Sequence, residues 1–331
     1  MKHTKLLPVI FMMALAMASC KQSKQVTYLG FQAPADSAQL FGPGVFSGIY
    51  DEFNASFDEQ NQKLYYTLRK GWFSFIILER RLTNGVWSDP DIATFSGTYR
   101  DADPFISPDG SRLIFCSDRP MHKGDTRLDW NIWMCERTED GWGEPVPLNF
   151  NTDNKNEMYP TMSKNGNIYF HADYEGEEEP LDIMHTNIYV AKKISDDRTY
   201  ADPEMVPSPA STDRSPEWDP FISPEEDYII FTAMLPGGIG GGDMYISFKR
   251  ENGLWGVPEN MGPKINSKAL DYCPNLSPDG KYLFFSSYRT PPRPVGENTY
   301  EFLKSVEPGP KGRAGNIYWI DSSVIEDLRN R

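Results

Sequence analysis

The chain is poor in the residues that carry redox and metal chemistry. Its 331 residues include only four cysteines and four histidines. The three histidines beyond the N-terminal region are widely spaced and match no common zinc motif. Three cysteines remain after Cys20, an odd number that cannot form a complete disulfide framework. Cys116 and Cys135 are expected on adjacent strands, where they either pair or remain buried thiols.

Basic residues and long apolar runs are also scarce. The 33 lysines and arginines are outnumbered by 47 aspartates and glutamates, which gives a formal net charge of -14. An acidic surface disfavours nucleic acid, so no nucleic-acid partner is expected. After the N-terminal region no segment is apolar enough to cross a membrane, and no Gly-x-Ser-x-Gly motif offers a nucleophilic serine.

The first residues indicate export. Lys2 and Lys5 precede an apolar stretch over residues 6–18, and small residues lead directly into Cys20. This arrangement resembles the lipobox of bacterial lipoproteins, in which the cysteine is diacylated and becomes the mature N-terminus. The alternative is an ordinary signal peptide with a chance cysteine.

The lipoprotein resemblance implies a domain organisation and a location. Residues 1–19 are then a signal peptide, residues 20–25 a tether and residues 26–331 a single domain. Lys21 follows the cysteine in place of aspartate, which by the sorting rule of such lipoproteins implies a lipid anchor in the outer membrane. Whether the domain faces the periplasm or the cell surface stays open.

One phrase recurs five times along the domain. Its clearest copies begin at Asp101, Glu217 and Asp271, and looser copies begin at Asn156 and Asp51. The first two share Asp-Pro-Phe-Ile-Ser-Pro, and the copies at Asp101 and Asp271 share Ser-Pro-Asp-Gly. In four copies a proline occupies the same position of the repeat, and successive prolines lie 54–60 residues apart, which suits one four-stranded unit per repeat. They are Pro104, Pro160, Pro220 and Pro274. The repeat predicts an all-β, five-bladed β-propeller.

Within each repeat, strand-like runs alternate with turn residues. In the second repeat a Pro-Asp-Gly turn at 108–110 is followed by runs at 113–117 and 131–135, and then by a proline-containing edge at 144–148. The fifth repeat supplies only three strands, the last at 315–320. Because an open sheet edge invites aggregation, we expect the N-terminal segment 26–31 to supply the fourth strand and close the ring.

The repeat also resembles a known family. Ser-Pro-Asp-Gly followed by Leu-x-Phe-x-Ser-x-Arg, at 107–119 and 277–289, is similar to the WD-like propeller repeats of TolB-type envelope proteins. The resemblance covers about residues 51–320. It implies the propeller fold, with six blades as the alternative because TolB-like propellers usually have six. Members of this broad group range from protein-binding scaffolds to enzymes, so the resemblance implies fold more than function.

One face of the propeller is expected to carry the function. The longest loops should all emerge there, and long loops on a rigid ring usually bind partners. They cover residues 120–129, 174–186, 235–242 and 290–314. We call this side the long-loop face, and the opposite side, which carries the Ser-Pro-Asp-Gly turns, the turn face.

Acidic residues are expected to surround the channel mouth on the long-loop face. Five of them begin the inner strands, namely Asp51, Asp101, Glu157, Glu217 and Asp271. Asp103 and Asp219 add two carboxylates, and Arg119 and Arg289 are placed to offset part of the charge. Crowded carboxylates perturb one another's pKa values. These nine residues are the candidate binding site.

Three interpretations of this ring remain open. Each acid could bond backbone amides or arginines and hold the blades together. The ring could bind a cation, with calcium favoured because oxygen ligands abound. It could also hydrolyse glycosides, with Asp101, Glu217 and Asp271 as candidate catalytic residues. Apart from calcium, no cofactor is expected.

The leading hypothesis from the sequence is a binding or scaffold protein rather than an enzyme. It would be anchored in the envelope by lipid and would dock an envelope protein or a polysaccharide on the long-loop face. The alternative is a carbohydrate-active hydrolase that uses the channel carboxylates.

Overall fold

The computed structural model describes residues 27–34, 36–48, 50–71, 74–153, 155–173, 186–195, 197–207, 216–289 and 314–331. The predicted signal peptide, the tether and Cys20 lie outside the described residues. So do most of the two predicted loops at 174–186 and 290–314.

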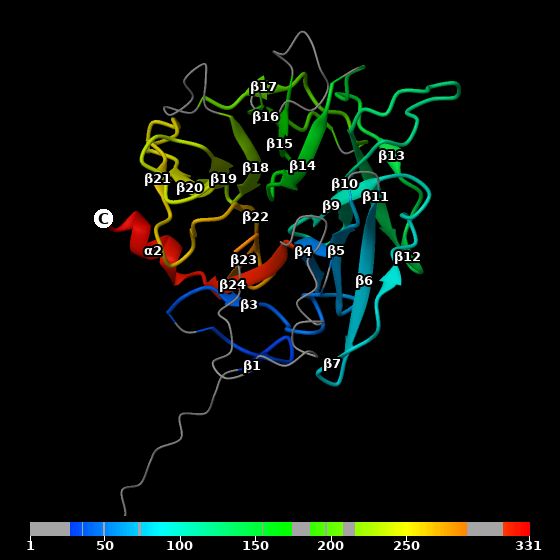
Figure 1. Ribbon diagram of the computed structural model, residues 1–331. Helices are drawn as coiled ribbons and strands as arrows, with labels where there is room; N and C mark the ends of the chain where they lie inside the picture. Colours follow the sequence, from blue (N-terminus) through cyan, green and yellow to red (C-terminus); the bar gives the residue numbers. More distant parts are fainter. Residues whose placement is uncertain are drawn as a thin grey trace, which may run out of the picture.

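Five antiparallel sheets stand around a common axis and form a five-bladed β-propeller (Figure 1). The first strand of each sheet contacts the first strands of the two neighbouring sheets, and the contact between the fifth and first blades closes the ring. The predicted five-bladed fold is therefore confirmed, and the six-bladed alternative is wrong.

Each blade pairs its strands in chain order. The first blade contains β4 (Asp51–Asp58), β5 (Lys63–Arg69), β6 (Phe75–Thr83), β7 (Val86–Trp87) and β8 (Asp91–Ile92). The second contains β9 (Asp101–Ile106), β10 (Arg112–Ser117), β11 (Asn131–Thr138), β12 (Gly141–Trp142) and β13 (Val146–Pro147). The third contains β14 (Glu157–Met162), β15 (Ile168–Ala172), β16 (Asn187–Ala191) and β17 (Glu204–Met205). The fourth contains β18 (Glu217–Ile222), β19 (Tyr228–Ala233), β20 (Asp243–Phe248) and β21 (Glu259–Asn260).

The fifth blade combines the two ends of the domain. Its strands are β22 (Asp271–Leu276), β23 (Tyr282–Ser287), β24 (Asn316–Asp321) and β3 (Gln39–Leu40). Closure by an N-terminal strand is confirmed, but the predicted segment 26–31 is wrong. Its described residues belong instead to a separate hairpin of β1 (Thr27–Tyr28) and β2 (Phe31–Gln32).

Aromatic packing explains why β3 closes the ring. Phe41, directly after β3, is completely buried and packs against Phe284 and Trp319 of the fifth blade, with ring centroids 5.0 and 5.3 Å away. Phe46 stacks on Phe41 and also contacts Tyr66 of the first blade. Large buried aromatic pairs of this kind dominate packing energy. They fix residues 39–46 at the junction between the fifth and first blades.

Every inner strand has a β-bulge near its middle, at the residue before the repeated proline or its equivalent. The bulged residue has a positive φ between 49° and 58° in all five blades. These residues are Asn54, Asp103, Tyr159, Asp219 and Cys273. A positive φ costs of order 1–3 kcal/mol for residues other than glycine, so the surrounding structure must hold it in place.

The bulges hold neighbouring blades together. The amide of Asp103 donates to Thr67 Oγ1 in the preceding blade at 3.0 Å, and the amide of Asn54 donates to Ser286 Oγ at 3.1 Å. The amide of Asp219 donates to His171 Nδ1 at 3.1 Å. Each amide that loses its ladder partner at a bulge thus gains a partner in the adjacent blade.

The remaining elements complete the core. α2 (Ser323–Arg329) buries its apolar side in the main core, and Arg329 forms an ion pair of 2.6 Å with Asp227. Cys116 lies opposite Ile132 and Cys135 opposite Leu113, so the two cysteines project from opposite faces of one sheet and do not pair. Among the described residues, no helix is long and apolar enough to span a membrane.

Candidate functional site

The five acids that begin the inner strands are buried. Their exposed fractions are 6% or less, and those of Asp101, Glu157 and Asp271 are zero. We call this set, Asp51, Asp101, Glu157, Glu217 and Asp271, the acid ring. The structure brings it together at the long-loop end of the inner strands, as the sequence predicts, but does not present it to solvent.

Arginines of the same blades neutralise three members of the acid ring. Asp101 lies 2.6 Å from the Arg119 guanidinium, and Asp271 lies 2.5 Å from that of Arg289. Each arginine also donates to a serine hydroxyl of its own blade and to a backbone carbonyl of the connection that leads into that blade. In the first blade Arg69 pairs with Asp51 at 2.7 Å. Arg119 and Arg289 therefore do offset the charge, and Arg69 is a partner that the sequence analysis missed.

Four members of the acid ring also accept hydrogen bonds from backbone amides of nearby segments. Asp271 accepts from the Ser267 amide at 2.5 Å, and Asp101 accepts from the Gly97 amide at 3.3 Å. Glu157 accepts from both the amide and the hydroxyl of Thr152, at 3.1 and 2.8 Å. Asp51 accepts from the Gly315 amide at 2.7 Å. These bonds fasten the connecting loops to the inner strands, which matches the interpretation that the ring holds the blades together.

The five bulged residues fill the middle of the channel. We call this set, Asn54, Asp103, Tyr159, Asp219 and Cys273, the axial layer. The hydroxyl of Tyr159 in the third blade donates to the Pro274 carbonyl in the fifth at 2.8 Å. Phe105 and Phe221 lie next to the axial layer on its turn-face side, and their ring centroids are 6.5 Å apart. These pairs join blades that are not neighbours, so the described residues close the axis.

Asp103 and Asp219 do not lie at the channel mouth as predicted. Both are buried in the axial layer, where the bulge turns them inward. Asp103 is 3.2 Å from Cys116 Sγ and 3.4 Å from Asn54 Nδ2, and Asp219 accepts from the Cys273 amide at 3.3 Å. Burial raises the pKa of Asp103 to about 6, and burial together with the nearby Asp103 raises the pKa of Asp219 well above its ordinary value.

The histidines do not assemble a metal site. His171 is buried beside Asp219, and its Nδ1 accepts a hydrogen bond from the Asp219 backbone amide. Burial lowers the pKa of His171 to about 3. It is therefore a neutral hydrogen-bond acceptor. His122 is exposed, and His185 lies outside the described residues. No three histidine, cysteine or acidic side chains of the described ranges are placed to hold a metal ion, so the calcium interpretation gains no support from them.

An open groove lies on the long-loop face, between the first and second blades. Its volume is about 570 Å³, and its walls include Phe75, Tyr99, Arg100, Asp118, Arg127 and Leu128. Tyr99 and Leu128 are among the exposed large apolar side chains. Sequence analysis missed this groove. Residues 120–129 signalled a long loop, but nothing in the sequence showed that residues 97–100 of the preceding connection would lie against it.

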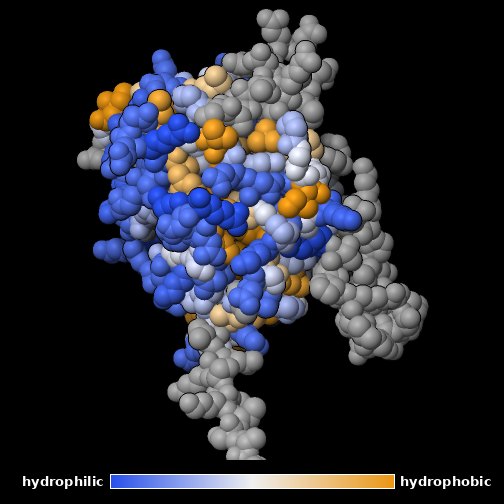
Figure 2. All heavy atoms as spheres, turned by 90° about the vertical axis from the view of Figure 1, so that its left-hand side faces the viewer, coloured by the Kyte–Doolittle hydropathy of each residue, from blue (hydrophilic) through white to orange (hydrophobic). Residues whose placement is uncertain are grey.

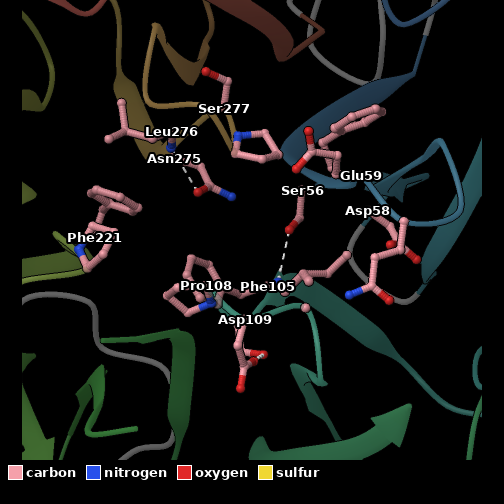
Figure 3. Close-up of a pocket in the computed structure, with 17 residues that line it drawn as sticks. Ser56, Asp58, Glu59, Phe105, Pro108, Asp109, Phe221, Asn275, Leu276 and Ser277 are labelled. Atoms are coloured by element: carbon pink, nitrogen blue, oxygen red, sulfur yellow. Dashed lines mark hydrogen bonds between the residues drawn. The ribbon is translucent and has the colours of Figure 1, made fainter. Parts of the chain in front are cut away.

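A smaller cavity of about 170 Å³ lies at the axis on the turn face. Figure 3 shows Phe105, Phe221 and Leu276 around it, with Pro108, Ser56 and Asn275 from three blades. Asn275 Nδ2 donates to the Ala55 carbonyl at 2.9 Å, and the backbone amide of Ile106 donates to Ser56 Oγ at 3.0 Å. These two polar groups of the cavity wall are thus used in bonds between blades.

The fold and site define a β-propeller whose channel is closed by its own side chains. No protein-family profile and no curated protein sequence matches the chain. Its structure is similar to that of TolB from Acinetobacter baumannii, with 14% identity, 74% of this chain and 51% of that chain covered, and a TM-score of 0.46.

Two enzymes show likenesses of the same order. An α-L-arabinofuranosidase from Lactobacillus brevis is 13% identical over 81% of this chain and 90% of its own, with a TM-score of 0.48. A gluconolactonase from Xanthomonas campestris is 13% identical over 77% of this chain and 80% of its own, with a TM-score of 0.47. All three likenesses concern the propeller fold alone, and none assigns an activity.

Proposed function

We propose that this protein is a binding or scaffold propeller of the bacterial envelope, which docks a protein or a glycan in the groove on its long-loop face. The observation that carries the proposal is the groove itself, which is open, lined by exposed apolar side chains and built on fixed arginines. Pockets of 300–1,000 Å³ with a few placed polar groups are typical of binding sites.

The groove is held rigid by its own contacts. The Arg100 guanidinium binds Asp118 at 2.6 Å and the Leu128 carbonyl at 3.0 Å, and it lies 4.9 Å from the Trp130 ring. Arg127 binds Asp125 at 2.8 Å. Side chains that are already fixed lose little conformational freedom when a partner binds. Tyrosine and arginine are also enriched in interfaces, where they contact both apolar and polar groups.

Other surfaces fit a docking role less well. Figure 2 shows the side of the propeller that carries β21 and α2, and this side is mostly hydrophilic, with apolar side chains in small separate patches. Scattered apolar residues of this kind are usual on any soluble protein surface. Tyr99 and Leu128, in contrast, border one continuous hollow on the long-loop face. A second groove, of about 480 Å³ and bordered by the exposed Met205 and Leu254, lies between the third and fourth blades toward the turn face, away from the long loops.

The hydrolase alternative lacks a suitable pair of acids. A glycosidase needs two carboxylates that face a sugar-sized space. Asp101 and Asp271 are completely buried, and each is bound by an arginine and a backbone amide, while Glu217 is 1% exposed. The described geometry therefore favours binding over catalysis.

The proposed attachment is through lipid on Cys20, in the outer membrane, and it rests on the lipobox resemblance. The sequence around Cys20 supports it. Metabolic labelling with a radioactive fatty acid tests it directly, because a Cys20→Ser variant should lose the label.

A matched pair of substitutions tests the docking face. Leu128, in the groove, is 69% exposed, and Val86, on the opposite face, is 70% exposed. Both should tolerate glutamate without loss of stability. Purified wild type, Leu128→Glu and Val86→Glu would be compared on a glycan array and in affinity capture from an envelope extract, with binding of each recovered partner or glycan then measured by calorimetry.

We expect the partner or glycan to bind wild type and Val86→Glu, and to bind Leu128→Glu at least tenfold more weakly. Equal binding to all three proteins would contradict the groove as the docking site. Hydrolysis of arabino- or xylo-oligosaccharides that disappears in both Asp101→Asn and Glu217→Gln, with folding intact, would overturn the binding proposal in favour of catalysis.

A further inference from the structure

The first described residues of the domain are fixed to the turn face. The hydroxyl of Tyr28 donates to Asp279 Oδ1 at 3.1 Å, and the Tyr28 ring lies 4.6 Å from that of Tyr282. Asp279 belongs to the Ser-Pro-Asp-Gly turn between β22 and β23, and Tyr282 is the first residue of β23. On the other side of the hairpin, Trp87 Nε1 donates to the Leu29 carbonyl at 2.9 Å.

Close packing reinforces this attachment. Gly30 has a φ of 81° and lies so near the β6–β7 turn that a Cβ there would come within 2.7 Å of the Gly85 carbonyl oxygen. The hairpin therefore bridges the turns of the fifth and first blades and is anchored to both. Thr27, where the described chain begins, lies on the turn face, on the side of the molecule opposite the groove.

The distance along the chain from Cys20 to Thr27 is short. Seven residues span at most about 25 Å when fully extended, at about 3.3–3.6 Å per residue. A lipid on Cys20 would thus keep the turn face within about 25 Å of the membrane surface. Turning the long-loop face toward the membrane would require the tether to run almost fully extended past a whole blade, because that face lies at least one blade height, about 20 Å for a six-residue strand, further along the axis.

We propose that the anchored protein stands with its turn face toward the membrane and its long-loop groove directed away from it. This inference rests on the lipid attachment proposed above. It defines the partner more closely, because the groove is then accessible to a molecule on the far side of the propeller and not to one embedded in the anchoring membrane.

Energy transfer from a single label to the membrane surface tests this orientation. The three described cysteines are buried, so a thiol dye will react with an introduced surface cysteine. Asp140→Cys places a donor on the turn face, and Leu128→Cys places one on the long-loop face. Each lipidated protein is reconstituted in vesicles that carry an acceptor dye on their headgroups, at several acceptor densities.

We expect the donor at position 140 to lie closer to the acceptor plane than the donor at position 128, by about 20 Å or more. Equal distances, or a closer donor at position 128, would overturn the proposed orientation. A donor at Met234→Cys, in another loop of the long-loop face, should behave as the donor at position 128 does.

A second preparation separates orientation from lipidation. In this preparation a histidine tag replaces the chain up to and including residue 20, so the variants cannot be acylated. The tag attaches them to vesicles with nickel-chelating lipids. If the native protein carries no lipid but the tagged protein still places position 140 nearer the membrane, the attachment proposal fails while the geometry of the domain stands. If the tagged protein shows no difference, the hairpin does not set the orientation, and the inference is wrong.

Discussion

Asp103→Asn should make the propeller more stable at neutral and alkaline pH. The Asp103 carboxyl is buried at the axis, near Cys116, Asn54 and the second buried carboxyl, Asp219. No lysine or arginine of the described chain forms an ion pair with it. Burial raises its pKa from 3.8 to about 6, because the charged form loses its hydration without gaining a cation.

The size of the effect follows from this pKa difference. At about 1.4 kcal/mol per pH unit, the difference between 3.8 and about 6 corresponds to about 3 kcal/mol. Between these pH values the native state binds more protons than the unfolded state, so the free energy of unfolding falls as pH rises. The loss should be complete above about pH 7. Asparagine cannot ionise, so Asp103→Asn should exceed wild type by up to about 3 kcal/mol at pH 8 and by almost nothing near pH 4.

Urea denaturation from pH 4 to pH 8, followed by tryptophan fluorescence, measures this difference. His171 has the opposite effect over an overlapping range, because its pKa is lowered to about 3. The quantity to compare at each pH is therefore the difference in the free energy of unfolding between the variant and wild type, and not either pH curve alone. An Asp103→Asn variant that is destabilised by the same amount at every pH would refute the reasoning.

Asp101→Asn, two residues away, is the matched control. Asp101 is also buried but is paired with Arg119 at 2.6 Å. Its neutralisation should destabilise the protein by about 3–5 kcal/mol, because a largely buried guanidinium loses its partner. If one substitution stabilises the protein and the other destabilises it, the partner of each carboxyl, and not burial by itself, decides its contribution to stability.

Three further substitutions test other parts of the structure. Tyr159→Phe removes the hydrogen bond across the axis to Pro274 and should lower the free energy of unfolding by about 1–3 kcal/mol at pH 7; an unchanged urea midpoint would contradict the axial closure. His171→Gln should lessen the loss of stability as the pH falls from about 6.5 to 3, because in wild type the imidazole takes up a proton on unfolding in this range. Free energies of unfolding that fall in parallel for the two proteins would disprove this. Phe41→Ala should cost about 3–5 kcal/mol in calorimetry, whereas a loss below about 1 kcal/mol would show that β3 does not close the ring.

The candidate site shows where sequence reasoning reaches its limit. The acids at the start of the inner strands could be predicted to converge, because equivalent positions of a repeat occupy equivalent places around the ring. Their arginine partners could be predicted only in part. Arg119 and Arg289 belong to the repeated phrase, whereas Arg69 lies in the most divergent copy and gave no signal. The groove depends on loops from two blades, whose approach no local pattern encodes.

The amino-acid sequence by itself determined the strands, the turns and the number of blades. These features are local or periodic: Pro-Asp-Gly favours a tight turn wherever it occurs, and each copy of the repeat builds a similar sheet. Only the tertiary structure decided which side chains face the axis. A β-bulge adds one residue to a strand and interrupts the alternation of side chains, so Asp103 and Asp219 turn inward although the sequence placed them at the mouth. The closing strand was also decided in three dimensions, because Gln39–Leu40 lies beside aromatic residues that complete the junction between the first and last blades.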